Sequence, residues 1–270
     1  SDGCSLVTTI DATVQAYVEK NLQNAIDKYD IKNGAFCIVM DVNTGEIKAM
    51  ATLGSYDPNN YLEIYDDAAA ALLENERDAA LSLPETSDAY KAAIEQYKQD
   101  VASARMAQWR NRCVSDGYEP GSTFKVLTMS AALDCGAIDL NTPFHCSGSE
   151  QIPGRAQRLH CWRSTGHGAE KTPQALQNSC NIAFGHIGLR MGGDTFYDYL
   201  KSFGIMEKTG VDLPGEASGL FYERKYLNDP ANYGRSYLIT SSFGQSFRIT
   251  PMQLVRAVAA IVNGGYCLLY

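Results

Sequence analysis

The sequence lacks any run of basic residues. Its 270 residues contain 23 Lys and Arg against 31 Asp and Glu, so the formal net charge is -8 and the isoelectric point is near 5.0. Proteins that bind nucleic acid phosphates need clustered Lys and Arg. The charge pattern therefore excludes nucleic acid as the main partner.

The sequence also lacks a long apolar run. No stretch approaches the roughly 18 uninterrupted apolar residues of a membrane helix, and the N-terminus has no signal pattern of positive charge followed by apolar residues. Internal repeats and low-complexity linkers are missing too. With 45% hydrophobic residues, the chain can bury the core of one large domain or two small ones. It opens abruptly on a predicted strand over residues 6–10, so we expect that a natural N-terminal part precedes it.

The eight cysteines include no Cys-x-x-Cys pair. They are too dilute for the disulfide framework of a small scaffold, and their number alone decides nothing further. Cys37 lies in an apolar run, and we predict that it is a buried small hydrophobic residue.

The N-terminal pattern predicts a helix beside a hairpin. Asp11 precedes apolar residues at helical spacing, which predicts a helix that Asp11 caps and that runs through Ile26. The apolar run 35–41 predicts a strand, and the turn at 43–45 leads into a second strand over 47–52.

Residues 62–110 have a different composition, rich in Ala, Glu, Asp, Lys and Gln. Pro84 and Ser87 interrupt two helical stretches, so we predict two exposed helices that form an insertion. Charged residues at helical spacing are usually a solvated face, and we assign this segment no chemistry.

The C-terminal half is predicted to be mostly helical. Apolar spacing predicts helices over 123–134, 172–191 and 251–263. A sheet of the N-terminal strands packed against these central helices gives an α/β or α+β fold.

A serine and a lysine lie three residues apart in the segment Glu119-Pro120-Gly121-Ser122-Thr123-Phe124-Lys125. Pro and Gly break the preceding chain, so Ser122 begins a helix and Lys125 lies one turn further on the same face. A lysine kept neutral by burial can take the proton of a serine hydroxyl, and the helix N-terminus favours developing negative charge. Alone, the motif is weak, because an N-cap serine with a solvated lysine is favoured by roughly 10 to 1.

A second motif, Gln177-Asn178-Ser179-Cys180-Asn181, falls within the next predicted helical region. Ser179 could relay a proton, and Asn181 could hold a substrate amide in the same cleft. This segment alone would also be most simply a polar helix face. The pair of motifs, however, is typical of penicillin-binding proteins and serine β-lactamases.

Together with the motifs, several segments resemble those of class B penicillin-binding proteins of the elongation or sporulation type, in family order. These segments are residues 10–15, 41–45, 55–61, 212–216 and 249–251. The resemblance covers almost the whole chain. It implies one transpeptidase domain over residues 1–270, with the fold of penicillin-binding proteins and serine β-lactamases.

The resemblance also implies a reaction and a set of catalytic residues: Ser122 as nucleophile, Lys125 as its base, and Ser179 with Asn181 from the second motif. Ser122 would attack the carbonyl between the two terminal D-alanines of a peptidoglycan stem peptide. An amine of a neighbouring stem peptide would then resolve the acyl-enzyme. Penicillins and other β-lactams would acylate the same serine. The resemblance further implies a membrane glycan polymerase as partner and an N-terminal anchor at the outer face of the bacterial cytoplasmic membrane.

The family's third motif is Lys-Thr-Gly on an edge strand. Residues 208–210 have these letters, but they directly precede 211–216, where the family has a surface loop, so we interpret them as a decoy. We expect the true motif and the final strands to be missing from these 270 residues. Without them the oxyanion hole would lack one backbone donor, a loss that costs about a hundredfold or more in rate and would impair this chain on its own.

A group of potential metal ligands lies between and within the motifs: Cys146, His160, Cys161, His167 and Cys180. Zinc favours tetrahedra of thiolates and imidazoles, but without a short Cys-x-x-Cys spacing a metal has a chance of about one in four against buried thiols. The resemblance favours a zinc site, since elongation-type members carry one near the active serine. It implies Cys146, Cys161, His167 and Cys180 as ligands, which would tie residues 142–171 to the catalytic helix.

Two other functions remain open. A serine β-lactamase shares the first motifs but needs a group that activates water, and no segment resembles the glutamate region that one class uses. A non-catalytic scaffold of a wall-building complex is disfavoured by the intact motif residues.

Overall fold

The computed structural model describes residues 3–32, 34–52, 54–153, 155, 157–229 and 234–268. The chain folds into two compact units: Ser1–Asp11, Ile38–Ala49 and Cys113–Tyr270 make the first, and Ala12–Cys37 with Met50–Arg112 the second. Strands β1 (Phe36–Met40) and β2 (Ile47–Thr52) pair with each other, as predicted. A boundary between the two units falls within each of these strands. Cys37 in β1 is half-buried rather than buried, so that prediction is wrong.

In the second unit, helix α1 (Ala12–Tyr29) begins directly after Asp11 and runs almost one turn beyond its predicted end. Its Gln15 side chain fixes it to β2 by donating to the carbonyl of Met50 at 2.9 Å and accepting from the Met50 amide at 2.8 Å.

The predicted strand over residues 6–10 does not form. Leu6 and Val7 are 86% and 93% exposed. The side-chain hydroxyl of Thr9 donates a hydrogen bond to the carbonyl of Ile47. The alternating sequence fits a strand, but among the described residues no neighbouring strand pairs with it.

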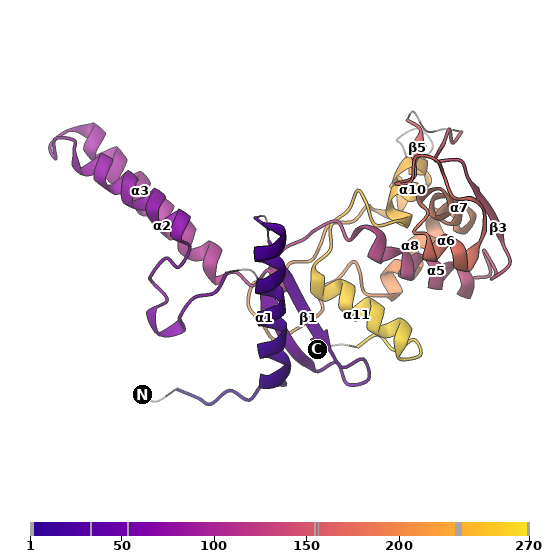
Figure 1. Cartoon of the computed structure of the whole chain (residues 1–270), viewed down its shortest axis with the longest axis horizontal. Helices are drawn as coiled ribbons and strands as arrows, with labels where there is room; N and C mark the ends of the chain where they lie inside the picture. Colours follow the sequence, from indigo (N-terminus) through magenta and orange to yellow (C-terminus); the bar gives the residue numbers. More distant parts are fainter. Residues whose placement is uncertain are drawn as a thin grey trace. The chain divides into compact units, whose positions relative to one another are not determined.

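The two helices predicted within 62–110 are confirmed as α2 (Asp67–Leu81) and α3 (Asp88–Trp109), which lie side by side (Figure 1). The Ser87 side chain caps α3 by accepting from the Tyr90 amide at 3.0 Å. None of the described residues of α3 is buried, which agrees with its polar composition. That the pair is an insertion stays a prediction.

The first unit holds the main core, which is helical (Figure 1). Helix α7 (Asn181–Met191) packs against α5 (Lys125–Asp134), α8 (Gly193–Ser202) and α10 (Gly234–Ser242). Gly188 lets α10 approach closely, because a Cβ there would lie 2.8 Å from the Cβ of Ser242. The α/β fold class is confirmed.

The remaining helices of this unit are α4 (Arg112–Ser115), which begins at the unit boundary, α6 (Thr172–Gln177), α9 (Arg224–Asn228) and α11 (Pro251–Val262). Two small antiparallel pairs lie between the motifs: β3 (Pro143–Cys146) with β6 (Gly168–Lys171), and β4 (Ser149–Glu150) with β5 (Leu159–His160). In the first pair Cys146 lies opposite Gly168.

The predicted helix over 172–191 is two helices. Helix α6 ends at Gln177 and α7 begins at Asn181, and Ser179 between them has a φ of +50°, a left-handed conformation that cannot continue a helix. The apolar spacing on both sides is helical, so periodicity alone hides this break. The second motif therefore lies at a helix junction and not on a helix face.

Candidate active site

Ser122 lies in a tight 3₁₀ turn, η2 (Gly121–Phe124), that leads directly into α5. Gly121 has a φ of +59°, and its amide donates to the carbonyl of Gly244 at 2.8 Å. A Cβ at Gly244 would lie 2.0 Å from the Gly121 oxygen, so two glycines allow this approach. The serine therefore begins a helix, as predicted, on a turn that a distant segment holds.

Lys125 is fully buried and joins the two motifs. Its Nζ lies 3.1 Å from Ser122 Oγ, 2.9 Å from Ser179 Oγ, 2.8 Å from the Ser179 carbonyl and 2.8 Å from Asn181 Oδ1. The structure thus brings together all four predicted catalytic side chains.

The oxygens around Nζ can accommodate either protonation state of Lys125. An ammonium has three N–H donors, and a neutral amine has two donors and one lone pair, so each form can engage three of the four oxygens. A neutral amine donates twice, to the Ser179 carbonyl and Asn181 Oδ1, and keeps a lone pair toward which Ser122 can donate its hydroxyl proton. A neutral Lys125 in this arrangement meets the geometric requirement for a base that takes the proton of a serine hydroxyl.

Burial explains why the amine of Lys125 loses its proton more easily than an exposed lysine does. Desolvation lowers the pKa of Lys125 to about 8, although negative charge on Cys161 or Cys180 would raise it. The rings of Phe184 and Phe243 lie with centroids 5.4 and 5.9 Å from Nζ, so apolar groups complete its surroundings. A free amine is therefore accessible near neutral pH.

The helix junction at Ser179 is held by two residues that the sequence did not single out. Glu170 on β6 accepts from the Asn178 side chain at 3.1 Å, and the Trp162 indole donates to the Asn178 carbonyl at 3.0 Å. Glu170 is only 6% exposed. An acidic residue in a short strand and a tryptophan in a loop give no pattern that would have revealed this role.

The four predicted metal ligands also converge. Cys146 ends β3, Cys161 follows β5, His167 precedes β6, and Cys180 caps α7 by accepting from the Ala183 amide. Their ligand atoms all lie within 4.8 Å of one another. His167 Nε2 is buried, and among the described residues it has no hydrogen-bond partner. Three thiols and one imidazole form a donor set that suits zinc.

Glycines allow the loops of this cluster to meet. Gly148 and Gly166 have φ values of +88° and +75°, and a Cβ at either position would lie 1.9–2.1 Å from the other loop's backbone. Although burial opposes its ionisation, backbone hydrogen bonds from Arg163 and Asn181 lower the pKa of Cys161, whereas burial raises the pKa of Cys180. Cys161 therefore forms a thiolate more readily than Cys180 does.

The profile of the family described as penicillin binding protein transpeptidase domain matches residues 35–268. The chain belongs to this family. Its relatives include stage V sporulation protein D of Bacillus subtilis, 32% identical over 265 residues, and peptidoglycan D,D-transpeptidase MrdA of Acinetobacter baumannii, 28% identical over 266 residues. The alignments cover 98% and 97% of this chain but 34% of each relative. The chain therefore spans about a third of the length of these relatives. The predicted resemblance to class B penicillin-binding proteins is confirmed.

Solved structures agree on the fold of this penicillin-binding protein domain. The transpeptidase domain of Burkholderia pseudomallei penicillin-binding protein 3 matches with a TM-score of 0.69 at 23% identity, covering 99% of this chain and 61% of that one. A peptidoglycan glycosyltransferase from Burkholderia ambifaria matches with the same TM-score and identity, covering 97% of this chain and 63% of that one. None of the described helices is long and apolar enough to cross a membrane.

The Lys208-Thr209-Gly210 segment of this domain lies in a loop and not on a strand. Glu216 accepts from the amides of Thr209 and Gly210 at 2.6 and 3.1 Å, which stabilises the loop locally. This geometry agrees with the interpretation of these letters as a decoy.

Proposed function

We propose that this chain carries the acyl-transfer centre of a serine D,D-transpeptidase that cross-links peptidoglycan stem peptides. The observation that carries the proposal is the buried Lys125, whose Nζ lies within 3.1 Å of both motif serines. Family membership and relatives named as peptidoglycan D,D-transpeptidases support the substrate.

The reaction has two steps. Lys125 takes the hydroxyl proton of Ser122, and Oγ attacks the carbonyl between the terminal D-alanines. The peptide C–N bond breaks, the departing D-alanine amine receives a proton by way of Ser179 Oγ, and an ester remains on Ser122. The amine of a second stem peptide then attacks this ester, forms the cross-link and returns the proton to Ser122. Asn181 positions the lysine by accepting from it at 2.8 Å.

A β-lactam would acylate Ser122 by the same attack, opening its ring without losing a leaving group. We expect intact-protein mass spectrometry after incubation with a penicillin to show one persistent adduct in the protein that carries this domain. Ser122→Ala should abolish the adduct, whereas Ser103→Ala, at an exposed position of α3, should leave it unchanged.

Each other outcome favours a different function. Rapid release of hydrolysed penicillin, without a persistent adduct, would favour a serine β-lactamase. A protein that never forms the adduct although it is folded would favour a non-catalytic scaffold.

We also propose that Cys146, Cys161, His167 and Cys180 hold a structural zinc ion. The convergence of their ligand atoms, including the 3.7 Å approach of His167 Nδ1 to Cys161 Sγ, supports the proposal. A bound zinc would supply cross-linking of the loops and no chemistry at the peptide. The residues themselves bring the end of β3 and the loop between β5 and β6 beside the junction that presents Ser179.

Zinc content provides the test. We expect about one zinc per chain in protein purified without chelator. Cys146→Ser should lower both the zinc content and the melting temperature, whereas the exposed Cys135 offers a matched control, since Cys135→Ser should change neither. Zinc content near zero in the unsubstituted protein would contradict the proposal.

Finally, the resemblance supports an anchored protein at the outer face of the cytoplasmic membrane that works with a glycan polymerase. Protease accessibility of the parent protein in spheroplasts, and its co-purification with a polymerase after cross-linking, would test these two features. Resistance to external protease would contradict the location.

A further inference from the structure

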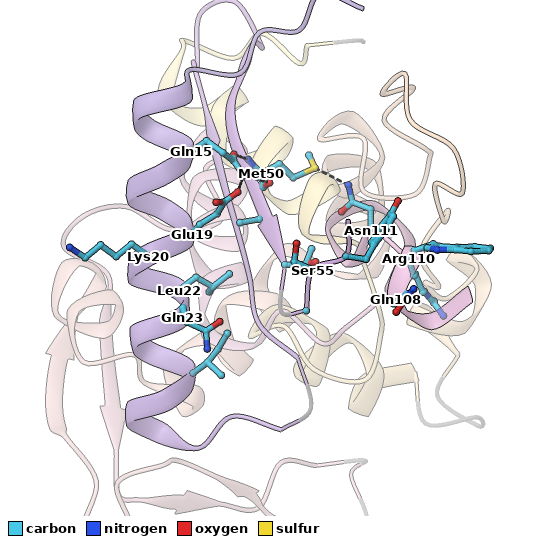
Figure 2. A pocket seen from close by; sticks show the side chains of 16 residues that line it. Gln15, Glu19, Lys20, Leu22, Gln23, Met50, Ser55, Gln108, Arg110 and Asn111 are labelled. Atoms are coloured by element: carbon cyan, nitrogen blue, oxygen red, sulfur yellow. Dashed lines mark hydrogen bonds between the residues drawn. The ribbon is translucent and has the colours of Figure 1, made fainter. Parts of the chain in front are cut away.

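The second unit contains a cavity of about 650 Å³ that the catalytic residues do not line (Figure 2). Helix α1 forms one wall, with Glu19, Leu22 and Gln23 directed toward the cavity. The opposite wall is formed by residues 54–56 and by 108–111 at the end of α3. All of these segments belong to the same compact unit, so the cavity is complete within it.

Amide side chains build the walls of this cavity. Gln15 is bound to the Met50 backbone, and Gln108 donates to the carbonyls of Glu63 and Tyr61 at 2.6 and 3.3 Å, so these two amides have structural roles. Gln23 is different: its Nε2 donates to Asp27 at 2.8 Å, while its carbonyl oxygen accepts from no residue in the described ranges.

Two hydroxyls are available on the wall opposite Gln23. Within the part of the chain that the structure describes, Ser55 Oγ and the Tyr56 hydroxyl have no hydrogen-bond partner. Both residues line the cavity and Ser55 is exposed. The cavity thus offers uncharged groups that can both donate and accept.

Aromatic side chains link the cavity to a neighbouring hollow. Tyr56 and Trp109 also line a second, smaller hollow together with Pro58 and Tyr61. The Trp109 indole donates to the Tyr61 carbonyl at 2.9 Å, and the two rings lie with centroids 5.8 Å apart. This bond fixes the indole while leaving the side chain 39% exposed.

The chemistry of the lining selects one class of ligand. Sugar rings have a rim of hydroxyls, which amides and hydroxyls recognise, and C–H faces, which favour the electron-rich face of an aromatic ring. One carboxylate, Glu19, and two cations, Lys20 and Arg110, line the cavity, so charges of both signs are present and no cluster of cations favours a phosphate.

We propose that this cavity is a non-catalytic site for the sugar residues of a glycan strand, with Gln23, Ser55 and Tyr56 binding hydroxyls and Trp109 stacking on a ring face. The choice of a wall glycan rests on the proposed transpeptidase function. Such a site would hold the strand whose stem peptides are cross-linked, and it would do so without contacting the peptide.

The test uses a peptide-free tetrasaccharide of alternating N-acetylglucosamine and N-acetylmuramic acid, titrated into the full-length protein by calorimetry. We expect saturable binding that Trp109→Ala and Gln23→Ala each weaken about tenfold or more. Glycan binding that is unaffected by both substitutions, or no binding at all, would overturn the proposal. A free stem peptide that binds here instead, with the same sensitivity to both substitutions, would also overturn it.

The chain provides a matched control for the Gln23 substitution. Gln96 on α3 bonds Asp100 at 2.9 Å in the same i, i+4 arrangement as Gln23 with Asp27. Gln96→Ala should leave the tetrasaccharide affinity unchanged. Gln23→Ala changes a residue on the surface of α1, so it remains informative if Trp109→Ala does not fold.

Penicillin labelling of Ser122 in the same preparations separates this inference from the proposed function. Labelling without tetrasaccharide binding would overturn the inference alone. Tetrasaccharide binding without labelling would instead leave a glycan-binding scaffold.

Discussion

At the residue scale, the proposed role of Lys125 as base predicts how the rate of acylation depends on pH. Its amine is a base only when neutral, and burial lowers its pKa to about 8. Below that pH the protonated form dominates, so acylation slows as pH falls. Above it the neutral form dominates and the rate reaches a plateau.

We therefore expect the second-order rate constant for penicillin acylation of Ser122, measured by stopped flow from pH 6 to 9.5, to rise about tenfold per pH unit well below 8 and to level off above it. Lys125→Met should remove both the rate and its pH dependence. A plateau that already begins near pH 6 would contradict a lysine base with this pKa.

The roles of single residues were only partly predictable from sequence. The three-residue spacing of Ser122 and Lys125 predicts only that both lie on one helical face, and their catalytic roles were implied by the second motif and the family resemblance. Glu170 and Trp162 were missed because their contacts to Asn178 arise from tertiary packing and not from local spacing. The metal ligand set came from family resemblance, since spacing alone disfavoured it.

At the scale of elements, helices α7 and α10 approach each other closely at Gly188. Gly188 has room for no Cβ, because one would lie 2.8 Å from the Ser242 Cβ and 3.3 Å from the Leu238 carbonyl. Helix α10 can relieve such a clash only by moving away from α7, which opens the buried core around it.

We expect Gly188→Ala to lower the free energy of unfolding by about 1–3 kcal/mol in chemical denaturation. The double substitution with Ser242→Gly should recover part of that loss, because it removes the nearest atom. Additive losses in the double variant would show that the contact is not the cause.

Helices with recognisable caps were predicted better than the N-terminal strand and the helix break at Ser179. The helices within 62–110 and after Thr250 have caps that sequence reveals, such as Ser87 and the Thr250–Gln253 capping box. The strand expected over residues 6–10 failed because strand formation depends on a pairing partner. The junction at Ser179 was hidden because a single left-handed residue leaves apolar periodicity unchanged.

At the scale of the whole molecule, the two motifs meet although 54 residues separate Lys125 from Ser179. Composition and periodicity predicted the α/β class, but neither could place α5 against α7, and the family resemblance supplied that expectation. The proposed glycan cavity was not foreseen, because its lining comes from three separate segments whose Gln, Ser and Tyr residues form no motif.

The contact between Gly121 and Gly244 has a consequence for biosynthesis. The turn that carries Ser122 is completed by a segment that the ribosome makes about 120 residues later, and the bridge of Tyr118 to Ile249 reinforces this. Contacts of such long separation form late in folding. We expect nascent chains of the parent protein that are stalled before Gly244 leaves the ribosome to resist a fluorescent penicillin, and chains stalled well after it to acquire labelling. Equal labelling of short chains would contradict this order. The domain would then react with penicillin only after the segment around Gly244 has been synthesised and has packed against the Ser122 turn.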